Sequence, residues 1–558
     1  MKTKHIIFVA VVRVLQAVLI QTFFQPDEYF QSLEVAHHAV FGYGHLTWEW
    51  STSNPIRSIL FPSLWIPVYW LLKISGLDET NALIVCPKIL QGFFAAITDV
   101  SVCRLSRRLF GREYTSLTLL VSLTSFFHGL ALVRTLSNSL ETSLTVLALS
   151  HWPAHSPPAK SFQTLLLPLL IASVACIVRP TNAILWLYLC AEFIFQSRFS
   201  RKAITNIFSA ALFVGVLSVG TMSITDSLYF GKPTFTPVNF LRVNASSVSL
   251  FYGGNPWHYY LTQAIPILLT TKLPLFFHGI FLTLSGRTPS PQLRTYARLI
   301  GWTLLVYSVA GHKEWRFIHP LLPLMHLFCV SSLCQATREI RGKSKLASTL
   351  LTPSGFCILL SLPAIVYTTF IHGRAQIAVM HHLRGLAHTD LTSIGFLTPC
   401  HSTPWASYLH RKSLDHGHAW SLGCEPPLNT PPTYMDQTTI FHHDPIAYLR
   451  INFPSTVDST FPPSPYPTTI PGSSPSFRTT WIEKKDMVTV AYVDQWRHTW
   501  PKYLVMFGVL PQMKDQEGTT VADVLHQKGY KRVWRTWNGF EEDEKRRGGV
   551  EVWRWTST

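Results

Sequence analysis

The sequence predicts an all-α polytopic membrane protein of roughly nine to eleven transmembrane helices, followed by a mixed α/β domain at its C-terminal end. Three observations predict this fold class. Hydrophobic residues make up 47% of the 558 residues and charged residues only 14%, against roughly a quarter charged in ordinary soluble domains. Residues 5–371 consist of apolar runs separated by short polar loops. Residues 372–558 instead have the composition of a soluble domain.

Most of the apolar runs are interpreted as transmembrane helices, because about 20 apolar residues cross the hydrocarbon core of a bilayer. These runs are 5–24, 82–102, 115–133, 139–152, 163–179, 183–197, 204–224, 262–284, 297–310, 318–336 and 349–371. A further run, 58–75, contains Pro62 and Pro67. We expect it to lie along the membrane or re-enter it, since a crossing there would reverse the orientation of everything after it. The first run lacks a small-residue cleavage site, so it is expected to remain as an anchor.

The net charge of +17 is distributed in a way that sets the orientation. Basic residues cluster between apolar runs, at Lys2/Lys4, Arg104–Arg112, Arg198–Lys202, Arg287–Arg298 and Arg338–Lys345. Placing all these clusters in the cytoplasm satisfies the positive-inside rule and makes the runs alternate. The predicted lumenal segments are then 25–81, about 134–138, 179–182, 225–261, 311–317 and everything after 371. A nucleic-acid-binding protein would need one continuous basic face, so that class is excluded.

We therefore expect a membrane domain over 1–371 and a lumenal domain over 372–558, the latter with a Pro/Ser/Thr-rich insertion at 455–480 that is predicted to be disordered. Asn244, in Asn-Ala-Ser, is a candidate glycosylation site in a predicted lumenal segment. Cys400 and Cys424 lie in the polar tail. In an oxidising lumen they could form a disulfide or remain two free thiols, and the residues alone do not choose between these states.

Two adjacent carboxylates, Asp27 and Glu28, open the first predicted lumenal segment within Gln-Pro-Asp-Glu-Tyr-Phe-Gln at 25–31. Carboxylates directly after a membrane helix are costly to hold near lipid, which indicates function. A carboxylate at the water–membrane boundary can take a proton from a sugar hydroxyl that attacks an activated donor. The alternative is structural: both side chains cap an interfacial helix whose first turn contains Pro26. Both interpretations stay open on these residues alone.

The segment Gly-His-Lys-Glu-Trp-Arg-Phe at 311–317 is the densest group of charges between two apolar runs. Lys313 and Arg316 are candidates to bind a phosphate, with His312 or Glu314 orienting them. The alternative is a charged turn closed by an internal Glu–Lys pair. Function is favoured because charges this close to the bilayer usually have a partner or a ligand.

Further side chains at the predicted lumenal edge are candidates for substrate binding. Arginines there depart from the positive-inside bias, which suggests pairing with a lipid phosphate, although snorkelling explains each of them equally well. Ring-rich stretches suit a sugar or a lipid headgroup, with an interfacial aromatic belt as the alternative. The candidates are Arg134, Asn138, Arg179, Trp257, His258, His37, Trp48 and Glu49. For His37 and His38, packing is favoured over metal binding, since no carboxylate or cysteine completes a zinc pattern with them.

Several catalytic classes leave no signature in the sequence. It contains no P-loop, no GxSxG, no HExxH and no Rossmann fingerprint. The Asp-x-Asp element by which many sugar-nucleotide transferases hold a metal is also missing. A nucleotide-sugar donor is therefore disfavoured.

These residues resemble a known family. The element at 25–31 is similar to a signature of the dolichol-phosphate-mannose-dependent α-mannosyltransferases (glycosyltransferase family 22), multi-spanning enzymes of the GT-C fold in the endoplasmic reticulum. His-Lys-Glu-x-Arg-Phe at 312–317 is similar to that family's second signature. Other stretches resemble the branch that adds the third mannose of the glycosylphosphatidylinositol (GPI) anchor precursor. These stretches are 32–38, 44–50, 134–138, 252–258 and 399–404.

The resemblance implies an inverting transfer of one α-1,2-linked mannose from dolichol-phosphate-mannose, at the lumenal face of the endoplasmic reticulum membrane. The acceptor would be the lipid-anchored dimannosyl-glucosaminyl-acylphosphatidylinositol intermediate. By similarity Asp27 is the base and Glu28 the second candidate. The resemblance also implies that the enzyme needs neither a cofactor nor a catalytic metal. The leaving dolichyl phosphate would be stabilised by basic side chains. Candidates for that role are Lys313, Arg316, Arg134 and Arg179.

Two alternatives remain. One is a related transferase for a fourth GPI mannose or for the dolichol-linked oligosaccharide. The other is a lipid or sugar transporter, which would place paired polar sites midway through the helices and show internal repeats. Here the polar clusters are expected at the lumenal edges, which disfavours a transporter. The oligomeric state is not predicted.

Overall fold

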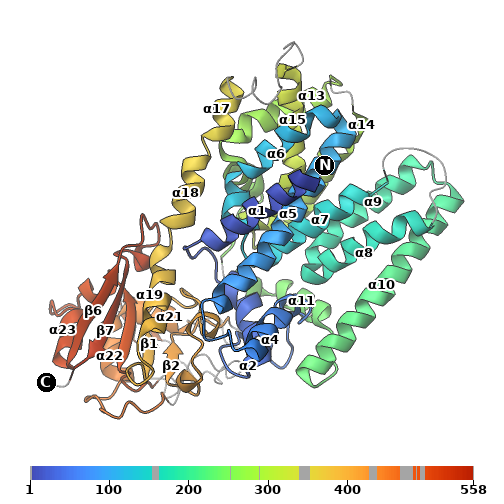
Figure 1. The fold of residues 1–558 in the computed structure, drawn as a ribbon. Helices are drawn as coiled ribbons and strands as arrows, with labels where there is room; N and C mark the ends of the chain where they lie inside the picture. Colours follow the sequence, from blue (N-terminus) through green and yellow to red (C-terminus); the bar gives the residue numbers. More distant parts are fainter. Residues whose placement is uncertain are drawn as a thin grey trace.

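The computed structural model describes residues 3–153, 162–251, 253–287, 290–337, 352–426, 436–464, 482–484, 487–489 and 497–556. These residues form a bundle of long helices and a smaller domain built on a mixed β-sheet, which lies beside one end of the bundle (Figure 1). The predicted fold class, a helical membrane protein with a C-terminal α/β domain, is confirmed.

The bundle helices follow the predicted apolar runs. They are α1 (Thr3–Leu19), α5 (Ala82–Phe110), α6 (Thr115–Leu123), α7 (Ser137–His151), α8 (Phe162–Val178), α9 (Ala183–Gln196), α10 (Arg201–Phe230), α12 (Ile265–Leu269), α13 (Leu273–Leu284), α14 (Pro291–Val309), α15 (Leu322–Thr337), α17 (Pro353–Leu359) and α18 (Leu362–Phe370). Among the described residues, 5 helical stretches are long and apolar enough to cross a membrane. They are Ala82–Phe110, Arg201–Phe230, Tyr260–Leu284, Trp315–Ala336 and Pro353–Gly385, with Phe162–Val178 a shorter apolar helix. The protein is therefore a multi-pass membrane protein, and the number of crossings stays a prediction.

Short π- and 3-10 elements interrupt several of the predicted runs. The run 115–133 ends as α6 at Leu123 and resumes as the π-helix η4 (His128–Leu132). The run 262–284 begins in the π-helix η7 (Tyr260–Ala264) and breaks again at Thr270, whose φ of 48° is left-handed. The sequence predicts one continuous helix for each run, because the few polar residues at the breaks, Thr124–Ser125 and Thr270–Lys272, do not end the apolar run. Such irregular turns often accompany functional sites.

The run 58–75 forms a 3-10 turn, η2 (Pro62–Leu64), and a short helix, α4 (Ile66–Ser75). Each proline occupies the first turn of its element, where its missing N–H costs nothing. The 10 residues of α4 rise only about 15 Å, half of the roughly 30 Å that a crossing requires. Figure 1 places α4 beside α2 (Glu34–Phe41) at one end of the bundle. The geometry agrees with the prediction that this run does not cross.

The C-terminal domain contains a 5-stranded sheet in the order β2-β1-β5-β7-β6. β1 pairs in parallel with both β2 and β5, while β7 pairs antiparallel with β5 and β6. The strands are β1 (Ile394–Phe396), β2 (Ala419–Ser421), β5 (Tyr503–Phe507), β6 (Tyr530–Thr536) and β7 (Val550–Trp555), and a separate pair joins β3 (Ile482–Lys484) to β4 (Met487–Thr489). The helices around the main sheet are α19 (Arg374–Gly385), α20 (Ala406–Leu409), α21 (Gln437–His443), α22 (Pro445–Asn452) and α23 (Val521–Gln527).

The central strand β5 shows how this sheet joins the two domains. Its sequence, Tyr-Leu-Val-Met-Phe, has no alternation of polar and apolar residues because both faces are buried. Tyr503 and Val505 belong to a core shared with the first loop of the membrane domain. Leu504 and Met506 point to the opposite face and belong to the core under α21, α22 and α23. One face of the sheet therefore shares a hydrophobic core with the loop that carries Asp27 and Glu28.

The chain passes between the domains at Gly373, which has a φ of 80° and directly precedes α19. A Cβ atom at this position would collide with the carbonyl oxygen of Phe23, so the close approach of the two backbones requires glycine. The same contact includes a hydrogen bond from the Phe23 N–H to the Gly373 carbonyl at 2.9 Å. This turn lies next to the predicted boundary at 371.

The predicted lumenal segments contact one another at one end of the bundle. Asp226, at the end of α10, accepts hydrogen bonds from the Ser58 hydroxyl at 2.9 Å and from the Ile59 N–H at 3.0 Å. Asn239 of α11 (Thr236–Asn244) donates to the Pro55 carbonyl at 3.0 Å. The charge-based orientation requires such a meeting of loops, since it assigns all of them to one side.

The predicted disordered insertion at 455–480 lies largely outside the described residues, which end at 464 in this region. Its first part packs on the C-terminal domain. The Ser464 N–H donates to the Gly417 carbonyl at 2.9 Å, and its hydroxyl lies 3.1 Å from Nδ1 of His498. Residues 455–464 therefore belong to the folded domain, because the backbone and hydroxyl of Ser464 find partners there.

Candidate active site

The site begins with a tight turn at Pro26. The N–H groups three and four residues later donate to the Pro26 carbonyl at 2.9 and 3.0 Å. The chain then continues as the π-helix η1 (Tyr29–Leu33) and as α2. No side-chain capping bond closes the start of η1, and Asp27 and Glu28 bind arginines instead. This arrangement disfavours the interpretation of the two carboxylates as helix caps.

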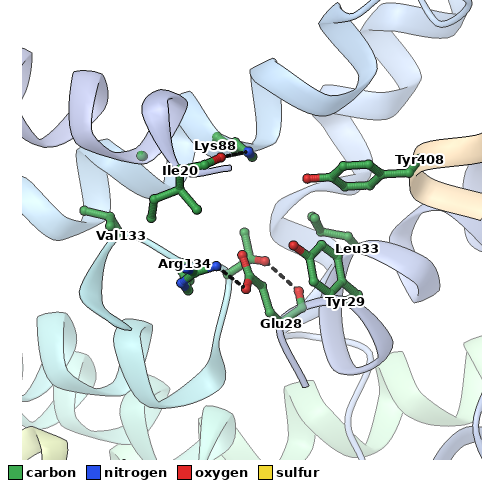
Figure 2. A pocket seen from close by; sticks show the side chains of 10 residues that line it. Ile20, Glu28, Tyr29, Leu33, Lys88, Val133, Arg134 and Tyr408 are labelled. Carbon is green, nitrogen blue, oxygen red and sulfur yellow. Dashed lines mark hydrogen bonds and ion pairs between the residues drawn. The ribbon is translucent and has the colours of Figure 1, made fainter. Parts of the chain in front are cut away.

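Glu28 forms a buried ion pair with Arg134 at 3.0 Å (Figure 2). The guanidinium also donates to the Thr22 carbonyl at 2.6 Å, to the Thr22 hydroxyl at 2.7 Å and to the Leu130 carbonyl at 2.8 Å. The backbone carbonyl of Glu28 accepts from the Thr135 hydroxyl at 2.6 Å. Burial raises the pKa of Glu28, and the charge of Arg134 offsets part of that effect. Arg134 thus ties the first loop to the turn before α7.

The pocket beside this pair is small. Its volume is about 10 Å³, which is room for about one water molecule. Figure 2 shows Tyr29 and Tyr408 next to each other on one side of it and Lys88 near Ile20 on another, where the Lys88 ammonium donates to the Ile20 carbonyl at 2.8 Å. A sugar ring does not fit in this volume, so Glu28 occupies a structural pocket.

Asp27 lies in a different environment, although it is the adjacent residue. Its Oδ2 is 2.5 Å from Nη1 of Arg316, and its side chain is 22% exposed, against 6% for Glu28. Arg316 also binds Glu314 with two nitrogens, at 2.6 and 2.9 Å. His312 lies 3.2 Å from the same carboxylate. The first loop and the 311–317 segment therefore form one charged cluster.

The ionisation of this cluster is set by its neighbours. Burial opposes the charge of Glu314, but Arg316 and His312 hold its pKa below the usual range. The hydrogen bond to Glu314 raises the pKa of His312 despite partial burial. Arg316 uses three of its N–H groups on Asp27 and Glu314. A guanidinium has five N–H donors, so two remain for an anion.

Lys313 does not contribute its charge to this cluster. Its ammonium donates to the Asn255 carbonyl at 2.8 Å, and the Asn255 side chain donates back to the Lys313 carbonyl at 2.7 Å. His312 Nδ1 makes a parallel contact to the Gly253 carbonyl at 2.8 Å. Together these bonds brace the 311–317 segment against the 253–258 segment. The observed contacts of Lys313 are those of a brace, and its proposed contact with phosphate stays a prediction.

Arg179 and Arg316 both approach the ring of Phe317, at 4.9 and 5.8 Å from its centroid. Nε of Arg179 also lies 3.2 Å from the Glu141 carboxylate. Asn138 is fully buried close by in α7, and neither polar atom of its side chain has a hydrogen-bond partner among the described residues. A buried, unsatisfied amide is costly and indicates a missing polar partner.

Three other predicted side chains, Trp48, Glu49 and His37, lie in the first loop. Glu49 binds Arg57 at 2.8 Å and Gln31 at 3.2 Å, and Trp48 precedes it in α3 (Trp48–Ser51). His37 is buried, and its Nε2 lies 2.8 Å from Nδ1 of His410 in the C-terminal domain. This placement favours packing for His37.

Trp257 and His258 belong to the 253–258 segment, which is joined to 311–317 through Gly253 and Asn255. Trp257 is 70% exposed, and His258 bonds the Thr262 hydroxyl at 3.1 Å. Asn244 is exposed at the end of α11. Exposure of Trp257 fits the interfacial alternative, because an aromatic ring at the membrane boundary needs no protein partner.

The C-terminal domain contributes contacts that sequence reasoning did not predict. Glu34 is buried and accepts from the Trp405 N–H at 2.8 Å and the Ser407 N–H at 3.2 Å. The rings of Tyr29 and Tyr408 meet edge to face, with centroids 5.7 Å apart. These contacts hold η1 and α2 against α20. Glu34 has no local sequence signal for this role, because its partners lie more than 300 residues away, at a separation of 371 for Trp405.

Two groups of side chains bring together atoms that could bind a metal ion. Cys400, His401 and Cys424 form one, but a disulfide joins the two cysteines, with Cα atoms 5.9 Å apart, and so occupies both sulfurs. Asp78 and Glu79 form the other with His410, whose Nε2 lies 3.2 Å from Asp78. That group is a hydrogen-bonded contact between the first loop and the C-terminal domain.

A second feature missed in the sequence is a buried ion pair inside the bundle. Arg13 of α1 binds Asp99 of α5 at 2.6 Å, both fully buried, and the Ser122 hydroxyl also bonds Asp99 at 2.6 Å. The expectation that polar clusters lie only at the lumenal edges is therefore wrong. The pair is tolerated because each charge neutralises the other and the remaining lone pairs have donors.

The buried carboxyl group of Glu34 predicts that the stability of the protein depends on pH. Burial raises the pKa of Glu34 to about 7, whereas an unfolded glutamate titrates near 4.3. The folded state therefore binds more protons between these values, and stability falls as pH rises from about 4.5 to 7, then levels off. The melting temperature of the purified protein should show this slope, while Glu34→Gln should show a shallower one and retain the Trp405 and Ser407 contacts. Parallel slopes for both proteins would contradict the assignment.

Fold and site together define a class: a polytopic membrane protein in which a partly exposed carboxylate, Asp27, pairs with an arginine, Arg316, at one end of the bundle. The chain belongs to the Alg9-like mannosyltransferase family, whose model matches residues 5–410. It is thus an α-mannosyltransferase, as the 25–31 and 312–317 elements predict.

Two relatives of known name support this family assignment. GPI α-1,2-mannosyltransferase 3 of Mus musculus is 35% identical over 458 residues, 81% of this chain and 79% of the relative. GPI mannosyltransferase 3 of Yarrowia lipolytica is 34% identical over 98% of this chain and 96% of its own length. Among solved structures, ArnT from Cupriavidus metallidurans bound to undecaprenyl phosphate is similar with a TM-score of 0.48 and 12% identity, covering 79% of this chain and 88% of that one. The transporter alternative finds no support among these relatives.

Proposed function

We propose that this protein transfers the third, α-1,2-linked mannose from dolichol-phosphate-mannose to the dimannosyl GPI-anchor intermediate, at the lumenal face of the endoplasmic reticulum membrane. Its relatives in mouse and Yarrowia carry the names of enzymes with this activity. The observation that carries the chemistry is the contact between Asp27 and Arg316 at 2.5 Å. It brings a proton acceptor and an anion-binding group together at the membrane boundary, where a lipid-linked donor presents its phosphate.

The reaction needs one base and one stabiliser of the leaving group. The 2-hydroxyl oxygen of the terminal acceptor mannose attacks C1 of the donor mannose, and Asp27 takes the hydroxyl proton. The bond from C1 to the phosphate oxygen breaks with its electron pair, so dolichyl phosphate leaves as an anion. Attack from the opposite face converts the β linkage of the donor into the α linkage of the product. No covalent enzyme intermediate forms.

Asp27 suits the role of base better than Glu28 does. Asp27 is 22% exposed and stands beside an arginine that retains two N–H donors. Glu28 is bound to Arg134 next to a pocket with room for one water molecule. A sugar hydroxyl can approach the partly exposed carboxylate of Asp27, whereas that of Glu28 is buried beside a pocket too small for a sugar ring.

Arg316 would stabilise the phosphate as its negative charge develops. We expect Arg316→Ala to lower the turnover rate about 100- to 1,000-fold, the range for the loss of one such donor. Arg316→Lys should recover only part of this activity, because an ammonium cannot hold Glu314 with two parallel bonds while contacting Asp27.

Lys313→Ala is the matched control for this substitution. It removes a neighbouring positive charge that braces Asn255. If the Lys313 and Arg316 variants lose activity and protein level in equal measure, the loop has a structural role and the assignment fails. Turnover is measured in membranes normalised for protein level.

Two modifications follow from a lumenal location of this end. We propose that Asn244 carries an N-linked glycan, since it is exposed at the end of α11, and that Cys400 and Cys424 form a disulfide in the secretory compartment. Glycosidase treatment and thiol labelling of the intact protein, respectively, test these two sites. An unmodified Asn244 together with labelled Cys400 and Cys424 would argue for the opposite orientation.

The lipid intermediates that accumulate on depletion test the acceptor. Cells that lose this protein should accumulate a GPI intermediate with two mannoses, and re-expression should remove it. Accumulation of a three-mannose GPI intermediate would instead indicate the fourth-mannose transferase. A truncated dolichol-linked oligosaccharide would indicate the N-glycan pathway. Re-expression of Asp27→Asn, at an equal protein level, controls for effects that do not depend on catalysis.

A further inference from the structure

His401 has an unusual backbone for a residue with a side chain. Its φ is 53°, in the left-handed region that most such residues avoid. Two constraints next to it fix this conformation. Cys400 is joined to Cys424 by the disulfide, and the Ser402 hydroxyl donates to the Pro399 carbonyl at 2.6 Å. Conformations of this kind cost free energy and tend to be kept where they position a functional side chain.

This conformation places the imidazole against Phe30, in the segment that carries the proposed base. The ring of His401 contacts Phe30, with centroids 4.4 Å apart, and stacks on His45 at 5.6 Å with an interplanar angle of 23°. Phe30 lies one helical turn after Asp27 in the same segment. The charge of Asp27 acts on His401 electrostatically, which agrees with this proximity. The side chain is half-buried, so one part of it remains accessible.

The imidazole is suited to bind a neutral hydroxyl group. Burial lowers the pKa of His401 to about 4, although the charge of Asp27 opposes the shift, so the ring is neutral near pH 7. Its Nδ1 lies 3.8 Å from Sγ of Cys424. When Nδ1 carries the proton and faces that sulfur, Nε2 has a lone pair that accepts a hydrogen bond from a hydroxyl. A neutral acceptor between two aromatic rings matches a sugar, which offers hydroxyl donors and an apolar ring face.

We propose that His401 binds the terminal mannose of the acceptor and orients its attacking hydroxyl toward Asp27. This inference rests on the function proposed above and adds a residue of the C-terminal domain to the active site. The membrane domain would supply the base and the phosphate-binding arginine, while the C-terminal domain supplies the acceptor contact. The disulfide would then act on the reaction by holding His401 in place.

The test uses the full-length protein in membranes, with dolichol-phosphate-mannose and the dimannosyl GPI lipid as substrates. His401→Ala should raise the KM for the acceptor about three- to tenfold, as expected for one lost hydrogen bond, with the KM for the donor unchanged within twofold. His401→Phe keeps the ring but cannot accept a hydrogen bond, so it should behave like His401→Ala. His401→Gln, whose amide oxygen accepts a hydrogen bond, should recover part of the acceptor affinity.

His416 provides a matched control, because it is also a histidine with a left-handed backbone, at a φ of 54°, but its side chain is 93% exposed. His416→Ala should leave both KM values unchanged. An unchanged acceptor KM in His401→Ala would overturn the proposal, as would equal increases for donor and acceptor or a recovery by His401→Phe. These outcomes leave wild-type transfer and its loss in Asp27→Asn intact, so they are distinct from a failure of the proposed function.

Discussion

Asp27→Asn is expected to lower the rate of mannose transfer about 100- to 10,000-fold, the usual contribution of a general base. The amide oxygen of asparagine can still accept the hydrogen bond from Arg316, so the cluster around Glu314 should remain folded. What the substitution removes is the capacity to take a proton from the acceptor hydroxyl. Transfer is measured in membranes with saturating donor, and the melting temperature is compared with that of the wild type.

Glu28→Gln is the informative control for this experiment. The two positions are adjacent, yet Glu28 faces a pocket too small for a sugar and binds Arg134. Its substitution should affect stability more than turnover per folded molecule. If Asp27→Asn transfers mannose at a rate near wild type while Glu28→Gln does not, the two roles are reversed and Glu28 is the base.

Arg134→Ala is expected to reduce stability by about 3–5 kcal/mol, because it leaves the carboxylate of Glu28 buried without its partner. The substitution also removes bonds to the Thr22 and Leu130 backbone, which tie the first loop to the bundle. The measurement is the melting temperature of the detergent-solubilised protein, with the level of folded protein in membranes as a second readout.

A double variant separates the free-energy cost of the unpaired Glu28 carboxylate from the cost of the other lost hydrogen bonds. Combining Arg134→Ala with Glu28→Gln removes both charges and should recover part of the lost stability. If the double variant is as unstable as the sum of the two single variants, the pair contributes no coupling energy and its structural assignment fails. Arg57→Ala, at an ion pair whose two side chains are 20% and 13% exposed, should cost less.

The sequence already located the loops that meet at the site. Asp27 and Arg316 belong to the two segments with the highest density of charge at the edges of apolar runs, and charge near a bilayer is a strong local signal. The same signal could not show that Lys313 braces Asn255 whereas Arg316 contacts the carboxylate, since the two residues have the same charge and lie three positions apart. Which of them reaches Asp27 depends on the turn at Glu314 and on the packing of η9 (Trp315–Leu321) against α7.

The two domains also differ in how far the sequence predicts them. Glu34 in the first loop, and His401 and His410 in the C-terminal domain, have no periodicity or composition that marks them as contacts between the two domains. Their contacts depend on a sheet whose central strand is buried on both faces and on a disulfide that sets one short segment. Long-range contacts of this kind leave no local pattern in one sequence.

By itself the sequence predicted a polytopic membrane protein, the orientation of its membrane domain, and the two charged segments at the lumenal edge. Those properties follow from the length of the apolar runs and from the positions of the basic clusters between them. Both can be recognised in short stretches of the sequence. Only the tertiary structure decided which carboxylate is accessible, because Asp27 and Arg316 are 289 residues apart and their contact arises from the packing of helices. It likewise decided that the C-terminal domain reaches the site, since backbone and side chains separated by more than 300 residues must be brought together before His401 can lie beside Phe30.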